Sequence, residues 1–271
     1  FKINFFTISP LICLFLILSI GVSHGSLDHI KGKKILKIFE LNNIYIFYLT
    51  YILIAISVII LWKIMPSISL LFFLIVASFH FGKEDTQFLI VENSYYIQLL
   101  FLLKGSLIIL APMYFHFDET ISIFRLLLID NEFFYKSLGF IETYKILLFG
   151  IILSSISSVL LLAKKFELKK FTIFLDYFSI LIINYYFSPL IAFTLYFCFL
   201  HSIRHSIALM FELDEKNLKN GFKVFIIKAI PLTILTAVFS LIGLFFLNNI
   251  YELNSSILKI IFIGLASLTF P

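Results

Sequence analysis

Nine apolar stretches, each close to the length of a bilayer-spanning helix, limit what this chain can fold into. A spanning α-helix needs about 20 apolar residues, because each residue adds about 1.5 Å along a hydrocarbon core of about 30 Å. The stretches lie approximately at 3–23, 43–62, 67–82, 95–117, 144–163, 171–187, 189–211, 223–247 and 256 to the end. We therefore predict an all-α integral membrane protein, a polytopic bundle of about 8–9 transmembrane helices.

Composition supports this class. Hydrophobic residues make up 61% of the chain and the mean hydropathy is +1.06, whereas soluble domains have roughly 45 to 50% apolar residues. A β-barrel is disfavoured because its strands would alternate apolar and polar residues. Cys13 and Cys198 lie in apolar runs without CxxC spacing, so we interpret them as core thiols. We expect one transmembrane helical domain over 1–271 with both termini trimmed, because the chain begins with Phe1 and stops inside an apolar run.

Two connections leave a choice of local structure. Ser188-Pro189 divides the sixth stretch from the seventh and favours a tight turn, since proline suits the first turn of a new helix. A single long kinked helix is the alternative. The longest polar connection, 118–143, mixes acids with Phe and Leu, and we expect a short interfacial helix there.

The basic residues predict the orientation. Connections after the first, third, fifth and seventh stretches hold twelve lysines: Lys31, Lys33, Lys34, Lys37, Lys83, Lys164, Lys165, Lys169, Lys170, Lys216, Lys219 and Lys223. The opposite side holds four basic residues, Lys2, Lys63, Arg125 and Lys136, beside five acids. The positive-inside rule then places the first set in the cytoplasm and the N-terminus outside a multi-pass protein of the cell (inner) membrane. The net charge of +5 reflects topology, and we expect no nucleic acid partner, because no soluble basic face exists.

Four histidines occur where a membrane helix tolerates them least. His24 and His80 lie near the ends of apolar stretches, and His201 and His205 lie together inside one. Ionisable residues at bilayer depth are costly and usually face a functional partner. The predicted orientation places all four in the cytoplasmic half of the bilayer, whereas His116 falls on the outer side and is left out of the cluster. A metal is the first partner to consider.

His201 and His205 are four residues apart, so both imidazoles lie on one helix face and can reach one ion. Neutral imidazole suits Fe, Zn, Cu and Ni, and the spacing does not choose among them. Hydrogen bonds between helices are the alternative use of such a pair. Arg204 lies on a different face and could pair with an acid or a lipid headgroup.

The contexts of the other two histidines contain candidate supporting groups. In the HGSLDH motif at 24–29, Asp28 shares a face with His24 and could accept a ring N–H from a ligand, with His29 beside it. Alternatively, Asp28 and His29 simply begin a solvated loop. His80 has Glu84 one turn later, and its alternative is an interfacial histidine reaching the headgroups.

Together, four imidazoles from three stretches describe an all-nitrogen site with coordination positions open to dioxygen. A surrounding wall of Phe and Tyr, of which the chain has 35 and 13, would accept a long apolar substrate dissolved in the lipid bilayer. Near the pair, Tyr196, Phe197 and Phe199 are candidate tunnel residues. The residues alone thus favour an iron oxygenase acting on a lipid.

Three motifs also resemble a known family. HGSLDH at 24–29, Phe79-His80-Phe81-Gly82 and His201-Ser202-Ile203-Arg204-His205 are similar to the signature elements of the Brp/Blh family of bacterial and archaeal β-carotene 15,15′-dioxygenases. The similarity covers nearly the whole chain in order, number of stretches and motif spacing. It implies an integral membrane enzyme that uses non-haem Fe(2+) and O₂ to cleave β-carotene into two retinals, with a functional link to a microbial rhodopsin.

By this resemblance the iron ligands are His24, His80, His201 and His205. The supporting candidates, which follow from the sequence contexts above, are Asp28, His29, Glu84 and Arg204. One departure is that the family tends to place another histidine after the Leu-Thr-x-Pro that ends this chain at 268–271.

Other classes fit less well. Membrane di-iron desaturases need about eight histidines and this chain has six, and the HExxH of a metalloprotease is absent. A rhodopsin is disfavoured because Lys228 and Lys259 lie near the ends of their stretches. A membrane haem- or proton-carrying transport protein, with His80 and His205 as axial ligands or relay sites, is the alternative function.

Overall fold

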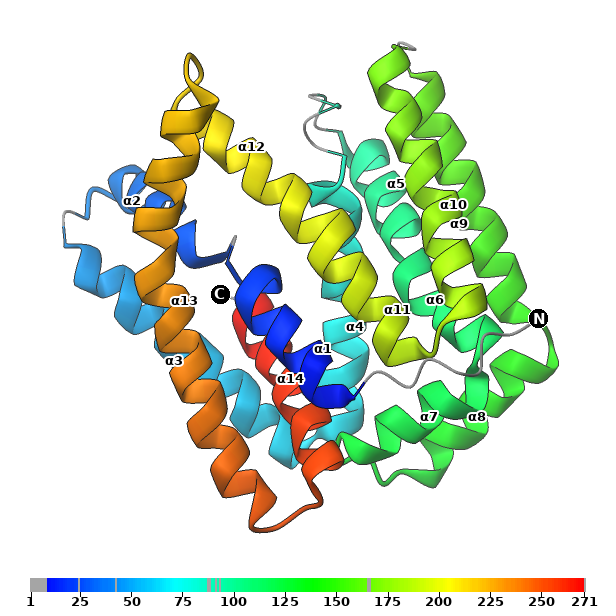
Figure 1. Cartoon of the computed structure of the whole chain (residues 1–271). Helices are drawn as coiled ribbons and strands as arrows, with labels where there is room; N and C mark the ends of the chain where they lie inside the picture. The colour runs from blue at the N-terminus through cyan, green and yellow to red at the C-terminus, as the bar shows by residue number, and fades with distance from the viewer. Residues whose placement is uncertain are drawn as a thin grey trace. The chain divides into compact units, whose positions relative to one another are not determined.

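The computed structural model describes residues 9–23, 25–41, 43–86, 89–90, 92, 94–164 and 167–270. Every regular element in these ranges is a helix, and they contain no β-strand (Figure 1). The predicted all-α class is therefore confirmed for the described part of the chain.

Each of the nine predicted stretches contains a helix within the described residues. Among the residues that the structure describes, seven helical segments are long and apolar enough to cross a membrane by length and composition: Pro10–Ile38, Ile44–Ile64, Pro66–Glu84, Tyr95–Phe115, Ile146–Ala163, Pro189–Leu213 and Leu218–Asn248. The other two stretches form shorter helices, α10 (Phe171–Tyr186) and α14 (Leu253–Thr269). Such a set of helices is compatible with a membrane bundle.

Contacts divide the chain into two compact units. The expected single domain stays a prediction. The first unit comprises Pro66–Tyr196 with Phe1–Ser9, and the second comprises Pro10–Met65 with Phe197–Pro271. The helices of the first unit are α4 (Pro66–Glu84), α5 (Tyr95–Gly105), α6 (Leu107–Phe115), α7 (Phe117–Leu126), α8 (Glu132–Thr143), α9 (Ile146–Ala163), α10 and α11 (Pro189–Leu195). Within it α9 packs against α5, α6 and α10 (Figure 1).

Glycines allow α4 and α5 to approach closely. A Cβ atom on Gly82 would clash with the carbonyl of Phe101, and one on Gly105 would clash with the carbonyl of Ser78. Because the atoms in the way belong to the backbone, no side-chain rotation can relieve either clash. This pair of glycines therefore sets the distance between the helix that carries His80 and its neighbour α5.

The connection 118–143 forms two helices rather than the single short helix that we expected. The chain breaks after α7, where Leu128 adopts a left-handed φ of 69°. Asn131 then starts α8, because its side chain accepts a hydrogen bond from the Phe134 N–H at 3.0 Å. Arg125 of α7 lies over the ring of Tyr135 in α8, 4.7 Å from its centroid, and this contact joins the two helices.

The turn between α10 and α11 is tight, as one of the two sequence alternatives predicted. Phe187 and Ser188 are both extended, with ψ of 151° and 156°, and Pro189 occupies the first turn of α11. The kinked single helix is therefore wrong.

In the second unit, α14 packs against α1 (Pro10–Leu16), α3 (Ile44–Ile64) and α13 (Leu218–Asn248) (Figure 1). The remaining helices are α2 (Asp28–Ile38) and α12 (Ile203–Leu213). Leu27, from the HGSLDH motif, is buried in one cluster with Leu209, Phe225 and Ala229. This cluster fixes the motif against α12 and α13.

We predict that Gly82→Ala or Gly105→Ala lowers the free energy of unfolding by about 1 to 3 kcal/mol, the usual cost of overpacking. Gly264→Ala in α14 is the matched control, because a Cβ there meets no atom within 4 Å. That change is expected to be neutral or stabilising by up to about 1 kcal/mol, since alanine is the better helix former. Denaturant unfolding in detergent, followed by circular dichroism, measures all three; equal stability of the three variants would contradict the close crossing.

Candidate functional site

His201 and His205 form a buried imidazole pair in the second unit. Their side chains are 1% and 6% exposed, and the ring planes are nearly parallel, 3° apart, with centroids 6.5 Å from each other. The spacing of four residues thus places both rings on one helix face, as predicted. The ring of Phe197 continues the row, stacked at 5.8 Å from the ring of His201.

A π-helical segment, Tyr196–Ser202, carries the first of these histidines. It joins α11 to α12, and such segments are rare and frequently occur at functional sites. The sequence pattern did not predict it, because one additional residue in a helical turn leaves an apolar stretch looking unchanged.

A second π-helical segment, Ile17–Gly21, ends the helix that leads to the HGSLDH motif. Its last residue contacts the first segment directly, because the Ser202 hydroxyl donates a hydrogen bond to the Gly21 carbonyl at 2.9 Å. A Cβ atom on Gly21 would lie 2.5 Å from Cε1 of Phe197. Glycine at this position therefore lets the two π-helical segments pack together. His24 itself lies outside the described residues.

The supporting candidates of the second unit lie close to these segments in sequence. Asp28 begins α2 and is half-buried. Nδ1 of the His29 ring lies 3.0 Å from the Ser26 carbonyl, a local hydrogen bond. Asp28 and His29 are the first residues of α2, so the alternative in which they begin a loop is wrong. Arg204, between the paired histidines, is half-buried.

In the first unit His80 lies near the end of α4. It is half-buried, as is Glu84, and its ring packs edge-on against Phe81 at 5.6 Å. Sequence reasoning passed over Asp85, the next residue, which is only 4% exposed. The Tyr196 hydroxyl donates to Oδ2 of Asp85 at 2.7 Å, and the Tyr196 ring packs edge-on against Phe81 at 5.5 Å.

Lys104 and His116 are two further polar residues of the first unit with partners or burial inside it. Lys104 is buried inside α5, and the Ser154 hydroxyl donates to its carbonyl at 3.1 Å. The sequence could have indicated this residue, because a lysine within an apolar stretch is unusual, but the count of basic residues on the two sides omitted it.

His116 donates from Nε2 to the Asn184 carbonyl at 2.8 Å and lies 3.7 Å from Glu119. It thus has partners of its own within this unit.

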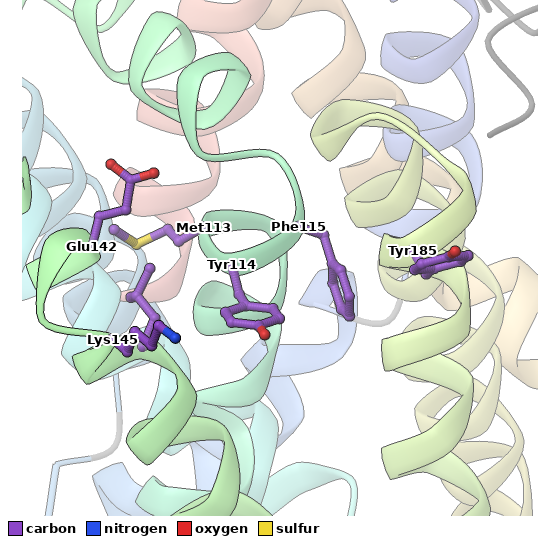
Figure 2. A pocket seen from close by; sticks show the side chains of 7 residues that line it. Met113, Tyr114, Phe115, Glu142, Lys145 and Tyr185 are labelled. Carbon is purple, nitrogen blue, oxygen red and sulfur yellow. The ribbon is translucent and has the colours of Figure 1, made fainter.

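A pocket of about 390 Å³ lies elsewhere in the first unit. Figure 2 shows the rings of Tyr114, Phe115 and Tyr185 in it, with Glu142 and Lys145 to one side. Of the predicted ligand histidines that the structure describes, His80, His201 and His205, none lines this pocket.

The donor chemistry of the described pair fits a metal ion. Two buried, neighbouring imidazoles are the nitrogen ligands that iron and other transition metals accept. No group of three or more His, Cys, Asp or Glu side chains suited to an ion occurs among the described residues, which exclude His24. The complete four-histidine site therefore stays a prediction.

Two comparisons with known proteins give matches over most of the chain. The family model for beta-carotene 15,15′-dioxygenase matches residues 15–271. A curated protein named beta-carotene 15,15′-dioxygenase, from uncultured marine bacterium 66A03, is 29% identical over 262 residues, which cover 95% of this chain and 89% of that relative. No solved structure matches. Because the family model spans nearly the whole length, including both π-helical segments and the histidine pair, this chain belongs to the β-carotene 15,15′-dioxygenase family.

Proposed function

We propose that this protein cleaves the central 15,15′ double bond of β-carotene with O₂ and releases two molecules of all-trans retinal. The reaction takes place at a non-haem Fe(2+) held by His24, His80, His201 and His205. The observation that carries the proposal is the buried, parallel pair of His201 and His205 in a chain of this family. The family also favours this enzyme over the haem- or proton-carrying transport protein considered above.

The reaction balances without any other reagent. The 15,15′ carbon–carbon double bond breaks, two carbon–oxygen double bonds form, and each retinal receives one atom of O₂. When bound, the iron would supply the redox chemistry that activates O₂ toward the polyene. His201 and His205 contribute imidazole nitrogen donors, and their burial keeps the reacting atoms away from water.

The aromatic residues around the pair suit an apolar substrate. Tyr196 and Phe197 are buried beside the histidines in sequence, and the Phe197 ring stacks on His201. Phe199 is 44% exposed, so it belongs to the outer side of the helix rather than to a tunnel wall. We therefore retain Tyr196 and Phe197 as the tunnel candidates that limit how a carotenoid lies near the metal.

Three other features belong to the proposal. Asp28, Glu84 and Arg204 orient the ligands from nearby turns. The protein resides in the cell (inner) membrane with its N-terminus outside, because twelve of its lysines lie in connections on one predicted side. Its retinal supplies a microbial rhodopsin in the same lipid bilayer.

Removing either paired imidazole tests the metal role. We expect His201→Ala and His205→Ala to lower retinal formation by about 100-fold or more, and to lower iron content in parallel, since even supporting residues of metal sites cost about 10- to 100-fold. His116→Gln is the control, because that histidine has its own partners in Asn184 and Glu119. The full-length protein is expressed in bacteria that accumulate β-carotene, with retinal measured by chromatography and iron measured on purified protein. Full iron content and activity in His201→Ala would refute the assignment.

Gly21→Ala tests the packing of Phe197 against His201. The added methyl group displaces the Phe197 ring, so we expect retinal formation to fall by about 10- to 100-fold, the range expected for a small misplacement of reacting groups. Gly264→Ala adds the same methyl group at an open position and is expected to retain activity. Initial rates of the iron-loaded proteins in detergent provide the measurement. The packing argument is wrong if both variants have the rate of the unsubstituted protein.

A further inference from the structure

The π-helical segment Tyr196–Ser202 is held at its first residue by a buried hydrogen bond. The Tyr196 hydroxyl donates to Oδ2 of Asp85 at 2.7 Å, and the two residues are 2% and 4% exposed. A hydrogen bond to a carboxylate is stronger than one between neutral groups, and burial strengthens it further. Tyr196 is therefore firmly attached to the residue that follows α4.

The last residue of the same segment is held as well. Ser202 is fully buried, and its hydroxyl donates to the Gly21 carbonyl at 2.9 Å. Gly21 is the last residue of the other π-helical segment. Both ends of Tyr196–Ser202 thus have a side-chain hydrogen bond to another part of the chain.

These attachments matter because a π-helical segment determines which way the following residues point. In an α-helix each residue turns by about 100°, and a π-helical segment accommodates an additional residue between its flanking turns. A shift of the segment by one residue would therefore rotate the side chain of His201 away from its present direction. The segment YFCFLHS contains no Gly or Pro that would impose a π-helix locally, so contacts outside the segment must select it.

We propose that Asp85 and Ser202 are positioning residues that lock Tyr196–Ser202 in its π-helical register and thereby fix the directions of His201 and His205. The inference deepens the proposed function and rests on it in one respect, namely that the two imidazoles bind the metal. The attachment points are also close in sequence to the other two proposed ligands. Asp85 follows His80 by five residues, and Gly21 precedes His24 by three.

Two pairs of variants separate this positioning role from general packing. Tyr196→Phe and Ser202→Ala each remove one hydroxyl from the ends of the segment. Tyr177→Phe removes the hydroxyl of another buried tyrosine, which donates to the Ile151 carbonyl at 3.4 Å. Ser154→Ala removes the hydroxyl of another buried serine, which donates to the Lys104 carbonyl at 3.1 Å. Both control residues lie in α9 or α10, outside the π-helical segments.

The first measurement is hydrogen exchange of the metal-free, full-length protein in detergent, read on peptides that cover 189–213. We expect Tyr196→Phe and Ser202→Ala to speed exchange of the amides in 196–202 on the order of tenfold, the effect of losing one hydrogen bond that opposes local opening. The two control variants are expected to leave these amides unchanged. Global unfolding, recorded in parallel, shows whether all four proteins remain folded.

The second measurement uses Co²⁺ as a spectroscopic probe of the histidine site. If the register is held by the two hydrogen bonds, Tyr196→Phe and Ser202→Ala change the visible absorption bands of the Co²⁺-loaded protein and weaken Co²⁺ binding. The controls keep the spectrum of the unsubstituted protein even where they lower its thermal stability by the same amount. If the hydroxyls have a purely structural role, their removal lowers thermal stability and leaves the visible absorption bands of the Co²⁺-loaded protein unchanged.

The outcomes separate the two proposals. Unchanged exchange of 196–202 in both Tyr196→Phe and Ser202→Ala overturns the positioning role, whatever the metal does. Faster exchange with an unchanged Co²⁺ spectrum also overturns it, because the register then does not govern the ligands. If the unsubstituted protein binds neither Co²⁺ nor iron, the metal site of the proposed function is wrong, and the exchange data alone decide whether the two residues hold the register.

Discussion

Polar side chains buried in apolar helices need hydrogen-bond partners within the fold, and this requirement determines where the helices of this protein meet. A buried polar group without a partner costs a few kcal/mol, whereas apolar side chains are equally well accommodated by lipid. The buried hydroxyls of Ser154, Tyr196 and Ser202 each donate to a group on another part of the chain. The apolar stretches thus specify where helices form, and a small number of polar contacts specifies which helices pair and in what register.

Much of the fold was predictable because it depends on local information. Length and hydropathy predict nine helical stretches, and each stretch contains a helix among the described residues, since a span needs only enough consecutive apolar residues. The break between α10 and α11 follows from Ser188-Pro189, because proline cannot continue the backbone hydrogen bonds of the preceding helix. The two helices in 118–143 were predicted only in part, because the left-handed turn at Leu128 has no glycine to indicate it.

In the candidate site too, the features that depend on local sequence were predictable, and those that depend on contacts between distant residues were not. The pairing of His201 with His205 follows from helical periodicity, so four-residue spacing was sufficient to predict it. The close crossing at Gly82 and Gly105, and the contact of Asp85 with Tyr196, join residues 23 and 111 positions apart. No periodicity within one helix contains such information, and Asp85 resembles an ordinary acid at a helix end. The π-helical segment Tyr196–Ser202 escaped prediction because, on the proposal above, its register depends on hydrogen bonds to Asp85 and Gly21.

The chemistry of the proposed reaction agrees with a positioning role for the buried residues Asp85 and Ser202. Cleavage of a carbon–carbon double bond by O₂ gives two aldehydes with no net gain or loss of a proton, so the reaction needs neither a general acid nor a general base. Oδ2 of Asp85 accepts a hydrogen bond from the Tyr196 hydroxyl, so this oxygen is engaged within the fold. What such an enzyme does require is a fixed direction of the metal ligands relative to a long polyene, because central cleavage depends on which bond lies beside the activated O₂. A helix whose register is fixed at both ends of a π-helical segment provides that direction, and helices packed only through apolar side chains would leave it free to vary.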